Sequence, residues 1–403
     1  MNVKPIPLVD EPMPRPQRWG QPELARLTAM VEQPSLFYWE GPQTTALLQE
    51  FRRHYPLREC FPTSSGSAAI HVAIAALRLQ PGDEVIVPAI TDMGSVIGIL
   101  YQQGVPVFAD VEPHTYNLDP ADVRRRLTGR TRAIMPVHLA GNPCDMEALL
   151  GLAREHQLEV IEDCAQAWGA LWQGQPVGLF GQLACYSFND YKHLSCGDGG
   201  LVASNDERFA GRLGKWGDKY YDRVTGLRDP EELAPNYRMS EPQAAVAAAQ
   251  LTRLAGIVAE RVRIGRQLQE GLGGIAGLSL PQIRPGDTSS CWFYLVRLDP
   301  ARFPVGRDAV VQALQAEGVP VEAGYIPKAV YQYPVFKHHN FFGGHWPVRE
   351  LGLTQMDYRS VRCPVAEAVL ADSLRFVVNE AMSETYIDKV VHAVRTVLHR
   401  LGR

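Results

Sequence analysis

A lysine near the middle of the chain stands where it could act as a reactive amine. Lys192 lies in CYSFNDYKHLSCGDGGLVASND (185–206), an irregular stretch between two strand-like runs, and several glycines follow it closely. Flexible glycine backbone can approach a lysine side chain and bury it, and burial favours the neutral amine. Taken alone, the segment also fits an ordinary surface lysine beside a glycine-rich loop.

An acidic residue ends a candidate strand in VIEDCAQAWGA (160–170). Asp163 would lie at the carboxyl end of that strand, where open α/β sheets bind their ligands. A carboxylate there could pair with a protonated ring nitrogen through a charge-assisted hydrogen bond. The alternative is an aspartate that only caps the next helix.

A run of small residues opens a helical pattern in PTSSGSAAIHVAIAAL (62–77). The residues from Ser64 to Ala69 leave the first-turn amides free to bind a phosphate. A serine-rich helix cap without a ligand fits the same residues. Together, however, the three segments supply what pyridoxal 5'-phosphate (PLP) needs: a lysine to carry it, an acid for its ring nitrogen and a phosphate site. We therefore predict a PLP site.

The elements that would position these residues follow the alternating pattern of a mostly parallel sheet covered by helices. Candidate helices cover 67–79 and 145–156, the second opening after a capping aspartate. The candidate strands are 83–90, 105–111, 132–139, 158–164, 183–189 and 200–205.

A long helical pattern over 240–272 is expected to lead from the first domain into a second one. Beyond it, strands are predicted at 289–299 and 374–380, and helices at 307–318 and 383–401. We therefore predict a large PLP-binding domain with an N-terminal arm over 1–260, and a small α+β domain over 261–403 that includes the aromatic loop 331–347.

The composition agrees with this division. A chain of 403 residues exceeds the usual size of one core, so two domains are expected. A net charge of -4 gives no reason to expect nucleic acid or a membrane surface as partner. The proline-rich N-terminus lacks the apolar core of a signal peptide. The seven scattered cysteines, without a C-x-x-C, are typical of reduced thiols in a cytoplasmic protein.

The chain resembles the DegT/DnrJ/StrS family of sugar aminotransferases, which have fold type I, the aspartate aminotransferase fold. The resemblance extends over nearly the whole chain. Besides the three segments above, it rests on PGDEVIVPAITDMGSV (81–96), TRAIMPVHLAGNPCDM (131–146) and PNYRMSEPQAAVAAAQL (235–251). It implies transfer of an amino group from L-glutamate or L-glutamine to a keto or aldehyde sugar, a sugar acid or a cyclitol, with PLP cycling with its pyridoxamine form.

The resemblance also implies roles for individual residues around the cofactor ring. Lys192 would carry the cofactor and Asp163 would pair with the pyridine nitrogen. Gln166 would contact the ring hydroxyl, and Ala165 would pack against one face of the ring.

A second set of residues is implied at the phosphate. Gly66, Ser67, the Ala68 amide and Ser187 would bind it. Asn236 would reach the phosphate of the neighbouring subunit. This last role implies a homodimer with shared active sites.

Two positions depart from the family pattern. Asp92 stands where an aromatic residue usually stacks on the cofactor, so Met93 could cover the ring instead. Asp92 could meet a substrate hydroxyl or ammonium, or it could cap the next helix. Trp168 stands where histidine is common, and we interpret it as core packing.

Further candidates rest on less. His138 and Tyr325 could contact the substrate, although His138 could equally form structural hydrogen bonds. The histidines of the aromatic loop, at 338, 339 and 345, could suggest a metal, but the interleaved aromatic residues favour a covering or dimer-contact loop, and we expect no metal.

Two other functions fit parts of the pattern. A pyridoxamine-phosphate-dependent sugar dehydratase of the same family would have histidine in place of the lysine, whereas Lys192 is intact and His193 only follows it. A PLP-binding regulator without turnover would not need the complete set of catalytic residues found here. Loss of the cofactor's visible absorbance on adding glutamate would distinguish an enzyme from such a regulator.

Overall fold

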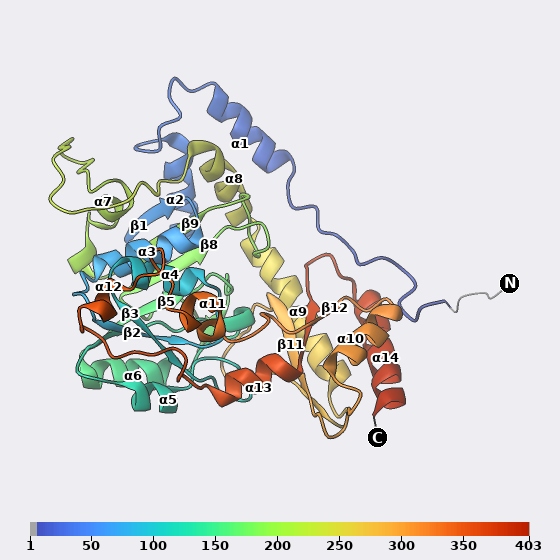
Figure 1. Cartoon of the computed structure of the whole chain (residues 1–403). Helices are drawn as coiled ribbons and strands as arrows, with labels where there is room; N and C mark the ends of the chain where they lie inside the picture. The colour runs from blue at the N-terminus through green and yellow to red at the C-terminus, as the bar shows by residue number, and fades with distance from the viewer. Residues whose placement is uncertain (1–5, 403) are drawn as a thin grey trace.

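A seven-stranded sheet forms the centre of the structure, a computed structural model that describes residues 6–402 (Figure 1). Its order is β1-β9-β8-β5-β4-β2-β3, parallel from β8 to β3, with β9 antiparallel to both of its neighbours. The strands are β1 (Glu59–Thr63), β2 (Glu84–Pro88), β3 (Val105–Ala109), β4 (Thr131–Ile134), β5 (Glu159–Asp163), β8 (Leu183–Ser187) and β9 (Gly200–Ser204). The predicted mostly parallel α/β sheet is confirmed.

Helices cover both faces of this sheet, which explains why its strands are apolar on both sides. Val85 and Val87 of β2 pack into one core, whereas Ile86 between them packs into another. The first face carries α3 (Gly66–Ala76), α4 (Gly94–Tyr101) and α7 (Leu213–Gly217). The second face carries α2 (Pro42–His54), α5 (Pro120–Arg126), α6 (Met146–His156) and α8 (Glu241–Leu251), while α1 (Gln21–Val31) packs on α8.

A smaller antiparallel sheet, of order β10-β11-β13-β12, lies beside the larger one. It has its own apolar core, formed with α9, α10 and α14. The elements are α9 (Leu254–Leu272), β10 (Leu278–Ser279), β11 (Phe293–Leu298), α10 (Arg307–Ala316), β12 (Val321–Ala323), β13 (Ser373–Val377) and α14 (Glu384–Leu401). A hairpin of β6 (Leu171–Trp172) and β7 (Gln175–Pro176) stands apart from both sheets.

The predicted helical pattern over 240–272 is two helices, α8 and α9, separated at Thr252 and Arg253. Both residues keep negative φ angles of -62° and -102°. Because the chain stays close to helical there, the apolar periodicity continues through the break and the sequence does not reveal it.

The aromatic segment packs against the larger sheet. Tyr331, Phe336, Trp346 and Tyr358 join the core that contains Phe108 of β3. The short helices here are α11 (Pro334–Lys337), α12 (Pro347–Glu350) and α13 (Pro364–Asp372). The aromatic segment therefore contributes to the same apolar core as β3, and the predicted domain boundary after residue 260 stays a prediction.

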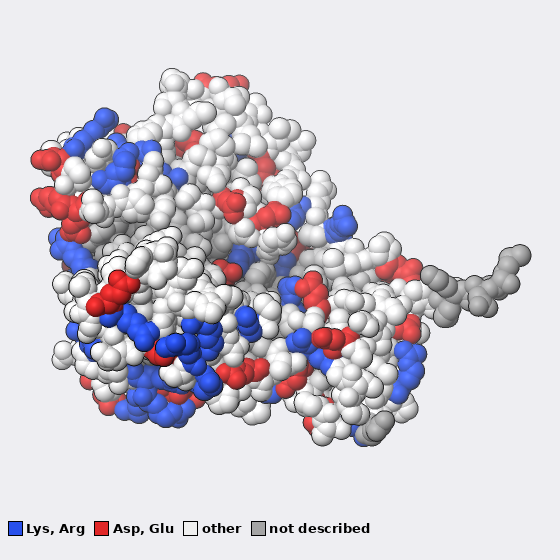
Figure 2. All heavy atoms as spheres, viewed as in Figure 1, with Lys and Arg blue, Asp and Glu red and all other residues white. Residues whose placement is uncertain are grey.

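Charges are mixed over the face seen in Figure 2, and basic side chains gather at its lower edge, near α5. The last turn of α5 holds Arg124, Arg125 and Arg126, and these pair with Glu155 and Asp122. Within residues 6–402, no helix combines the length and the apolar character needed to cross a bilayer.

Candidate active site

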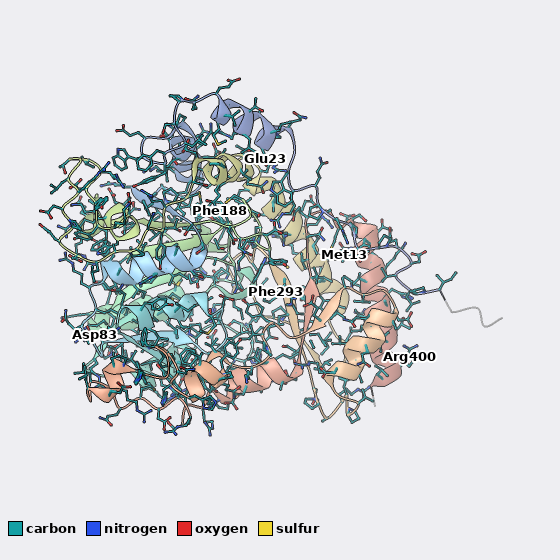
Figure 3. All side chains as sticks on the ribbon, turned by 45° about the horizontal axis from the view of Figure 1, so that its top comes forward. Met13, Glu23, Asp83, Phe188, Phe293 and Arg400 are labelled. Carbon is teal, nitrogen blue, oxygen red and sulfur yellow. The ribbon has the colours of Figure 1, made fainter. Side chains whose placement is uncertain are left out.

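A cavity of about 570 Å³ opens where β5 and β8 end and the two sheets meet. Phe293, which lies near the middle of the molecule in Figure 3, forms part of its wall from the small sheet. The structure brings together in this lining Gly66, Ser67, Asp92, Asp163, Ala165, Gln166, Ser187, Lys192 and Tyr325. Most of the residues predicted from the sequence therefore lie around one cavity.

Asp163 is buried at the end of β5 and is held by two donors. Its Oδ2 accepts a hydrogen bond from Ser95 Oγ at 2.7 Å, and its Oδ1 accepts one from the Ala165 amide at 3.0 Å. Burial raises the pKa of the Asp163 carboxyl, and these hydrogen bonds and Lys192 oppose that rise. A cationic ring N–H beside this carboxylate would offset the cost of burying it.

Ser95 was not foreseen from the sequence. It lies in the first turn of α4, and its hydroxyl also hydrogen-bonds the Thr91 hydroxyl at 2.6 Å. This chain of hydroxyls fixes the orientation of the Asp163 carboxylate. The only signal was the four-residue spacing of Thr91 and Ser95, because their partner Asp163 is far away in the sequence.

The Lys192 amine lies over an aromatic ring. Its Nζ is 3.7 Å from the centroid of the Trp292 ring. Burial lowers the pKa of Lys192 to about 8, although the nearby carboxylates of Asp163 and Asp92 oppose the shift. A larger fraction of neutral, nucleophilic amine is therefore present near neutral pH than for an ordinary lysine.

The predicted phosphate site is formed where α3 begins beside the end of β8. A Cβ on Gly66 would lie 2.8 Å from Ser187 Cβ, so only glycine allows this close approach. The first turn of α3 and the hydroxyls of Ser67 and Ser187 fit a phosphate dianion. The Ala68 amide, also predicted to bind phosphate, donates to Ser65 Oγ at 3.1 Å.

Gln166 is fixed by two hydrogen bonds. Its Oε1 accepts from the Ala140 amide at 2.9 Å, and its Nε2 donates to the Tyr325 hydroxyl at 3.0 Å. Because Tyr325 follows β12 of the small sheet, this bond joins the two sides of the cavity.

Asp92 lines the cavity and also caps α4. Its Oδ1 accepts a hydrogen bond from the Gly94 amide at 2.8 Å, as the helix-cap alternative requires. The residue is solvent-exposed, so a ligand can reach its carboxylate. Met93, by contrast, packs against the large core.

Arg375 adds a cation that the sequence did not reveal. It lies on β13, on the face of the small sheet that lines the cavity, 5.6 Å from the Phe293 ring centroid. It pairs with the half-exposed Glu322. A single arginine within a strand gives no sequence signal of its own, and only the fold places it opposite Lys192 in the same lining.

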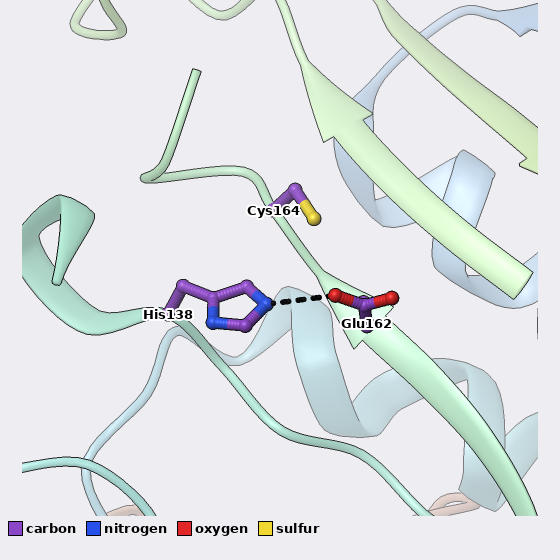
Figure 4. Close-up of side chains that lie close together, drawn as sticks. All are labelled: His138, Glu162 and Cys164. Atoms are coloured by element: carbon purple, nitrogen blue, oxygen red, sulfur yellow. Dashed lines mark hydrogen bonds and ion pairs between the residues drawn. The ribbon is translucent and has the colours of Figure 1, made fainter. Parts of the chain in front are cut away.

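His138 does not line the cavity, which corrects the expectation that it meets the substrate. Its ring faces Glu162 instead (Figure 4). It is fully buried, and its Nδ1 accepts a hydrogen bond from the Cys144 amide at 3.1 Å. Its Nε2 therefore carries the proton and donates to Glu162 at 3.2 Å. The residue has the structural role that was its alternative.

Within residues 6–402, one group of side chains has metal-ligand character: His138, Glu162 and Cys164, whose ligand atoms lie within 4.8 Å of one another. The Glu162 carboxylate also accepts three backbone N–H bonds, from Gly178, Phe180 and Gly181. Burial raises the pKa of the Cys164 thiol well above its usual range. A carboxylate already saturated with donors and a protonated thiol do not suit a metal ion.

Trp168 confirms the core-packing interpretation. It is fully buried against Tyr186 and Phe188, and its Nε1 donates to the Ser187 carbonyl at 2.8 Å. It thereby holds the end of β8 in place. Asn236 is exposed beside Asp218, outside the cavity lining of its own chain, and its predicted role across a subunit interface stays a prediction.

Comparison with known proteins identifies the family of this chain. The model of the DegT/DnrJ/EryC1/StrS aminotransferase family matches residues 20–395. The chain belongs to this family. The aminotransferase is 32% identical to GDP-perosamine synthase from Caulobacter vibrioides, over 86% of this chain and 88% of that protein. It is also 32% identical to a putative L-glutamine:3-amino-2,3-dideoxy-scyllo-inosose aminotransferase from Streptoalloteichus tenebrarius, over 97% and 95%.

Solved structures confirm fold type I for the aminotransferase. It matches the crystallographic structure of an aminotransferase from Psychrobacter cryohalolentis with a TM-score of 0.85 and 28% identity, over 97% of this chain and all of that one. The aminotransferase is PLP-dependent, as the sequence predicted. The Lys192–Asp163 cavity fits that cofactor by its amine, its buried acid and its glycine-lined helix start.

Proposed function

We propose that this aminotransferase moves an amino group from L-glutamate or L-glutamine to a carbonyl carbon of a sugar, sugar acid or cyclitol. The observation that carries the proposal is that Lys192 and Asp163 line one cavity together with a phosphate-binding helix start. The named activities of the two relatives, on a nucleotide-linked sugar and on a cyclitol, support this substrate class.

Each part of the proposed amino transfer has a residue in this cavity. PLP, when bound, supplies a ring that stabilises negative charge on the carbon next to the transferred nitrogen. The Lys192 amine would move a proton between the two carbons bonded to the transferred nitrogen. The Asp163 carboxylate is placed to hold a proton at the ring nitrogen, and Ser95 orients it.

The rest of the cavity suits a polyhydroxylated acceptor and an acidic donor. Thr91, Asp92, Asn189 and Asp198 offer hydrogen-bonding groups, and Trp292 offers an aromatic face. Such a mixture is typical of sites that bind sugars through hydroxyls and stacking. Arg375 can bind a donor carboxylate.

The placement of His193 weighs against the dehydratase alternative. This histidine is buried, and its Nε2 bonds the Ser290 carbonyl at 3.0 Å. It therefore points away from the cavity and cannot replace Lys192 as the base.

A homodimer in the cytoplasm completes the proposal. Large exposed apolar side chains gather in two sequence segments: Trp19, Leu24, Val31, Leu36, Phe37 and Trp39 in the first, and Val224, Leu227 and Leu233 in the second. The segments are neighbours, because Arg223 lies 5.2 Å from the Phe37 ring. A patch of this kind favours a protein interface. The seven free cysteines support a reducing compartment.

The test uses the visible absorbance of the bound cofactor. L-Glutamate or L-glutamine should abolish the absorbance, and a keto-sugar or keto-cyclitol that is a substrate should restore it. Borohydride reduction of the resting enzyme should leave a phosphopyridoxyl group on the peptide with Lys192. Modification of another lysine, or an absorbance that neither amino acid changes, would contradict the proposal.

A further inference from the structure

The loop that holds Lys192, residues 189–198, is fixed by side chains from distant parts of the chain. Arg18 donates from Nη1 to the Asp190 carbonyl and from Nη2 to the Lys192 carbonyl. The His193 carbonyl lies 3.5 Å from the same Nη2. Between them, the Tyr191 carbonyl accepts from Trp292 Nε1 at 2.6 Å. Four successive carbonyls therefore have side-chain donors, and Arg18 supplies three of these contacts.

Arg18 is itself anchored. Its own carbonyl accepts hydrogen bonds from Gln250 Nε2 at 2.6 Å and from Arg253 Nη2 at 2.5 Å. Both of these side chains also bind Glu23, in the first turn of α1. The backbone of Arg18 is thus held at the junction of α8 and α9, while its guanidinium reaches the loop.

The arm before Arg18 is attached to the small sheet and its helices. The Val9 amide donates to the Glu317 carbonyl at 2.9 Å, and the Pro14 carbonyl accepts from Asn379 Nδ2 at 2.9 Å. Lys389 of α14 pairs with Asp10 at 2.7 Å. Figure 1 shows the arm running from these helices to α1. Figure 3 labels Met13 on the arm and Glu23 in α1.

We propose that Arg18 is a positioning residue for Lys192, through which the N-terminal arm fixes the backbone of the cofactor-bearing lysine. The guanidinium is suited to this role because its planar fork serves several carbonyls at once. Trp292, which donates to Tyr191, also lies under the Lys192 amine, so loop and amine are held from two sides. The inference rests on the proposed role of Lys192, but its first test does not depend on the cofactor.

The experiment compares Arg18→Met, Arg18→Lys and, as a control, Arg15→Met, since Arg15 is an exposed arginine on the same arm. The first measurement is amide hydrogen exchange of the cofactor-free full-length protein. Loss of hydrogen bonds from a charged donor should accelerate exchange in 189–198 by about tenfold or more in Arg18→Met. Arg18→Lys should recover only part of the protection, and Arg15→Met should resemble the wild type.

The second measurement is the pH titration of the cofactor absorbance and the separate values of kcat and KM. In Arg18→Met the titration midpoint should shift and kcat should fall, with the glutamate KM changing less. Unchanged exchange and an unchanged midpoint would overturn the proposal. So would faster exchange spread equally over β5 and β8, because it would show a general loss of stability. If Arg18→Met does not fold, the same criteria apply to Arg18→Lys and Arg18→Gln. Failure of the Lys192 labelling test would instead reject the proposed role of Lys192, while faster exchange confined to 189–198 in Arg18→Met would still show that Arg18 fixes this loop.

Discussion

The environment of the Lys192 amine determines when it can react. A protonated amine cannot attack an aldehyde, and burial brings the pKa of this one to about 8. The neighbouring acids act in the opposite direction, since Asp163 and Asp92 both favour the charged form. The pKa of the Lys192 amine therefore depends on burial, which lowers it, and on two carboxylates, which raise it.

We predict that the cofactor-free protein incorporates PLP faster as the pH rises, with a midpoint near 8. The neutral fraction of Lys192 increases with pH and is nearly complete above its pKa, so the rate should then reach a plateau. Asp163→Asn removes a charge that raises this pKa, so its midpoint should move down. Stopped-flow absorbance would measure both rates, and a midpoint near the ordinary lysine value of 10.5 would contradict the argument.

Substitution of Asp92 can distinguish the half-reaction with the amino acceptor from the half-reaction with the amino donor. Its carboxylate lines the cavity while one oxygen caps α4. If it binds the acceptor, Asp92→Asn should slow the acceptor half-reaction by roughly ten- to a hundred-fold, the range for a hydrogen bond to a charged group. The glutamate half-reaction should change little. Single-turnover kinetics would measure both, and a loss of thermal stability alone would favour the helix-cap role.

The site residues that the sequence predicted are those with a local motif. Lys192, Asp163 and Gly66 stand in short segments whose types and order suggest a cofactor. Ser95, Trp292 and Arg375 have no such segment and reach the site only through packing between distant strands and helices. The two roles left open for His138 could not be separated from the sequence, because a histidine near a strand end looks the same whether it faces a ligand or Glu162.

At the scale of elements, α3 meets β8 where Gly66 lies against Ser187, at the predicted phosphate site. Most strands of the large sheet were predicted to within a few residues, because strands buried on both faces are continuously apolar. β1 was missed because ECFPT contains a charge and a proline, and it is the last strand of the sheet, beside β9. The packing of the aromatic segment against Phe108 of β3 could not be predicted, because composition does not say against which sheet a segment packs.

Gly66→Ala tests that contact. The added methyl would lie 2.8 Å from Ser187 Cβ, so α3 and β8 must move apart. Overpacking of this kind costs about 1–3 kcal/mol. We expect a lower melting temperature and a PLP affinity reduced by roughly tenfold or more, measured by calorimetry and by cofactor titration. The matched control is Gly151→Ala in α6, a half-buried position where a Cβ meets nothing within 4 Å. Equal changes in melting temperature and PLP affinity in both variants would show that the Gly66–Ser187 contact has no role beyond that of any helical glycine.

At the scale of the whole molecule, the proposed dimer would place Asn236 in the site of the partner subunit. The exposed Leu233 lies close to Asn236 in the sequence. The exposed Phe37 lies beside Arg223, which belongs to the same stretch of chain as Leu233. A second copy of the chain that covers these apolar side chains would remove them from water.

Mixing Asn236→Ala subunits with Lys192→Ala subunits tests this arrangement. Each heterodimer would have one site with both lesions and one with neither, so free exchange at equal amounts should restore about a quarter of the wild-type activity. Neither variant alone should reach that level. Heterodimers demonstrated by mass spectrometry but without recovered activity would place both residues in the same subunit's site.

The N-terminal arm also has a consequence for how the protein is made. Its residues leave the ribosome before the rest of this chain, yet Asp10 pairs with Lys389 and Val9 with Glu317, which are synthesised much later. Arg18 itself is held by Gln250 and Arg253, so its contacts to the Lys192 loop can form once α8 and α9 exist. The residues before Arg18, by contrast, find their partners only after α14 has been made. Synthesis therefore separates the fixing of the Lys192 loop, which comes first, from the attachment of the arm to the small sheet and its helices, which comes later.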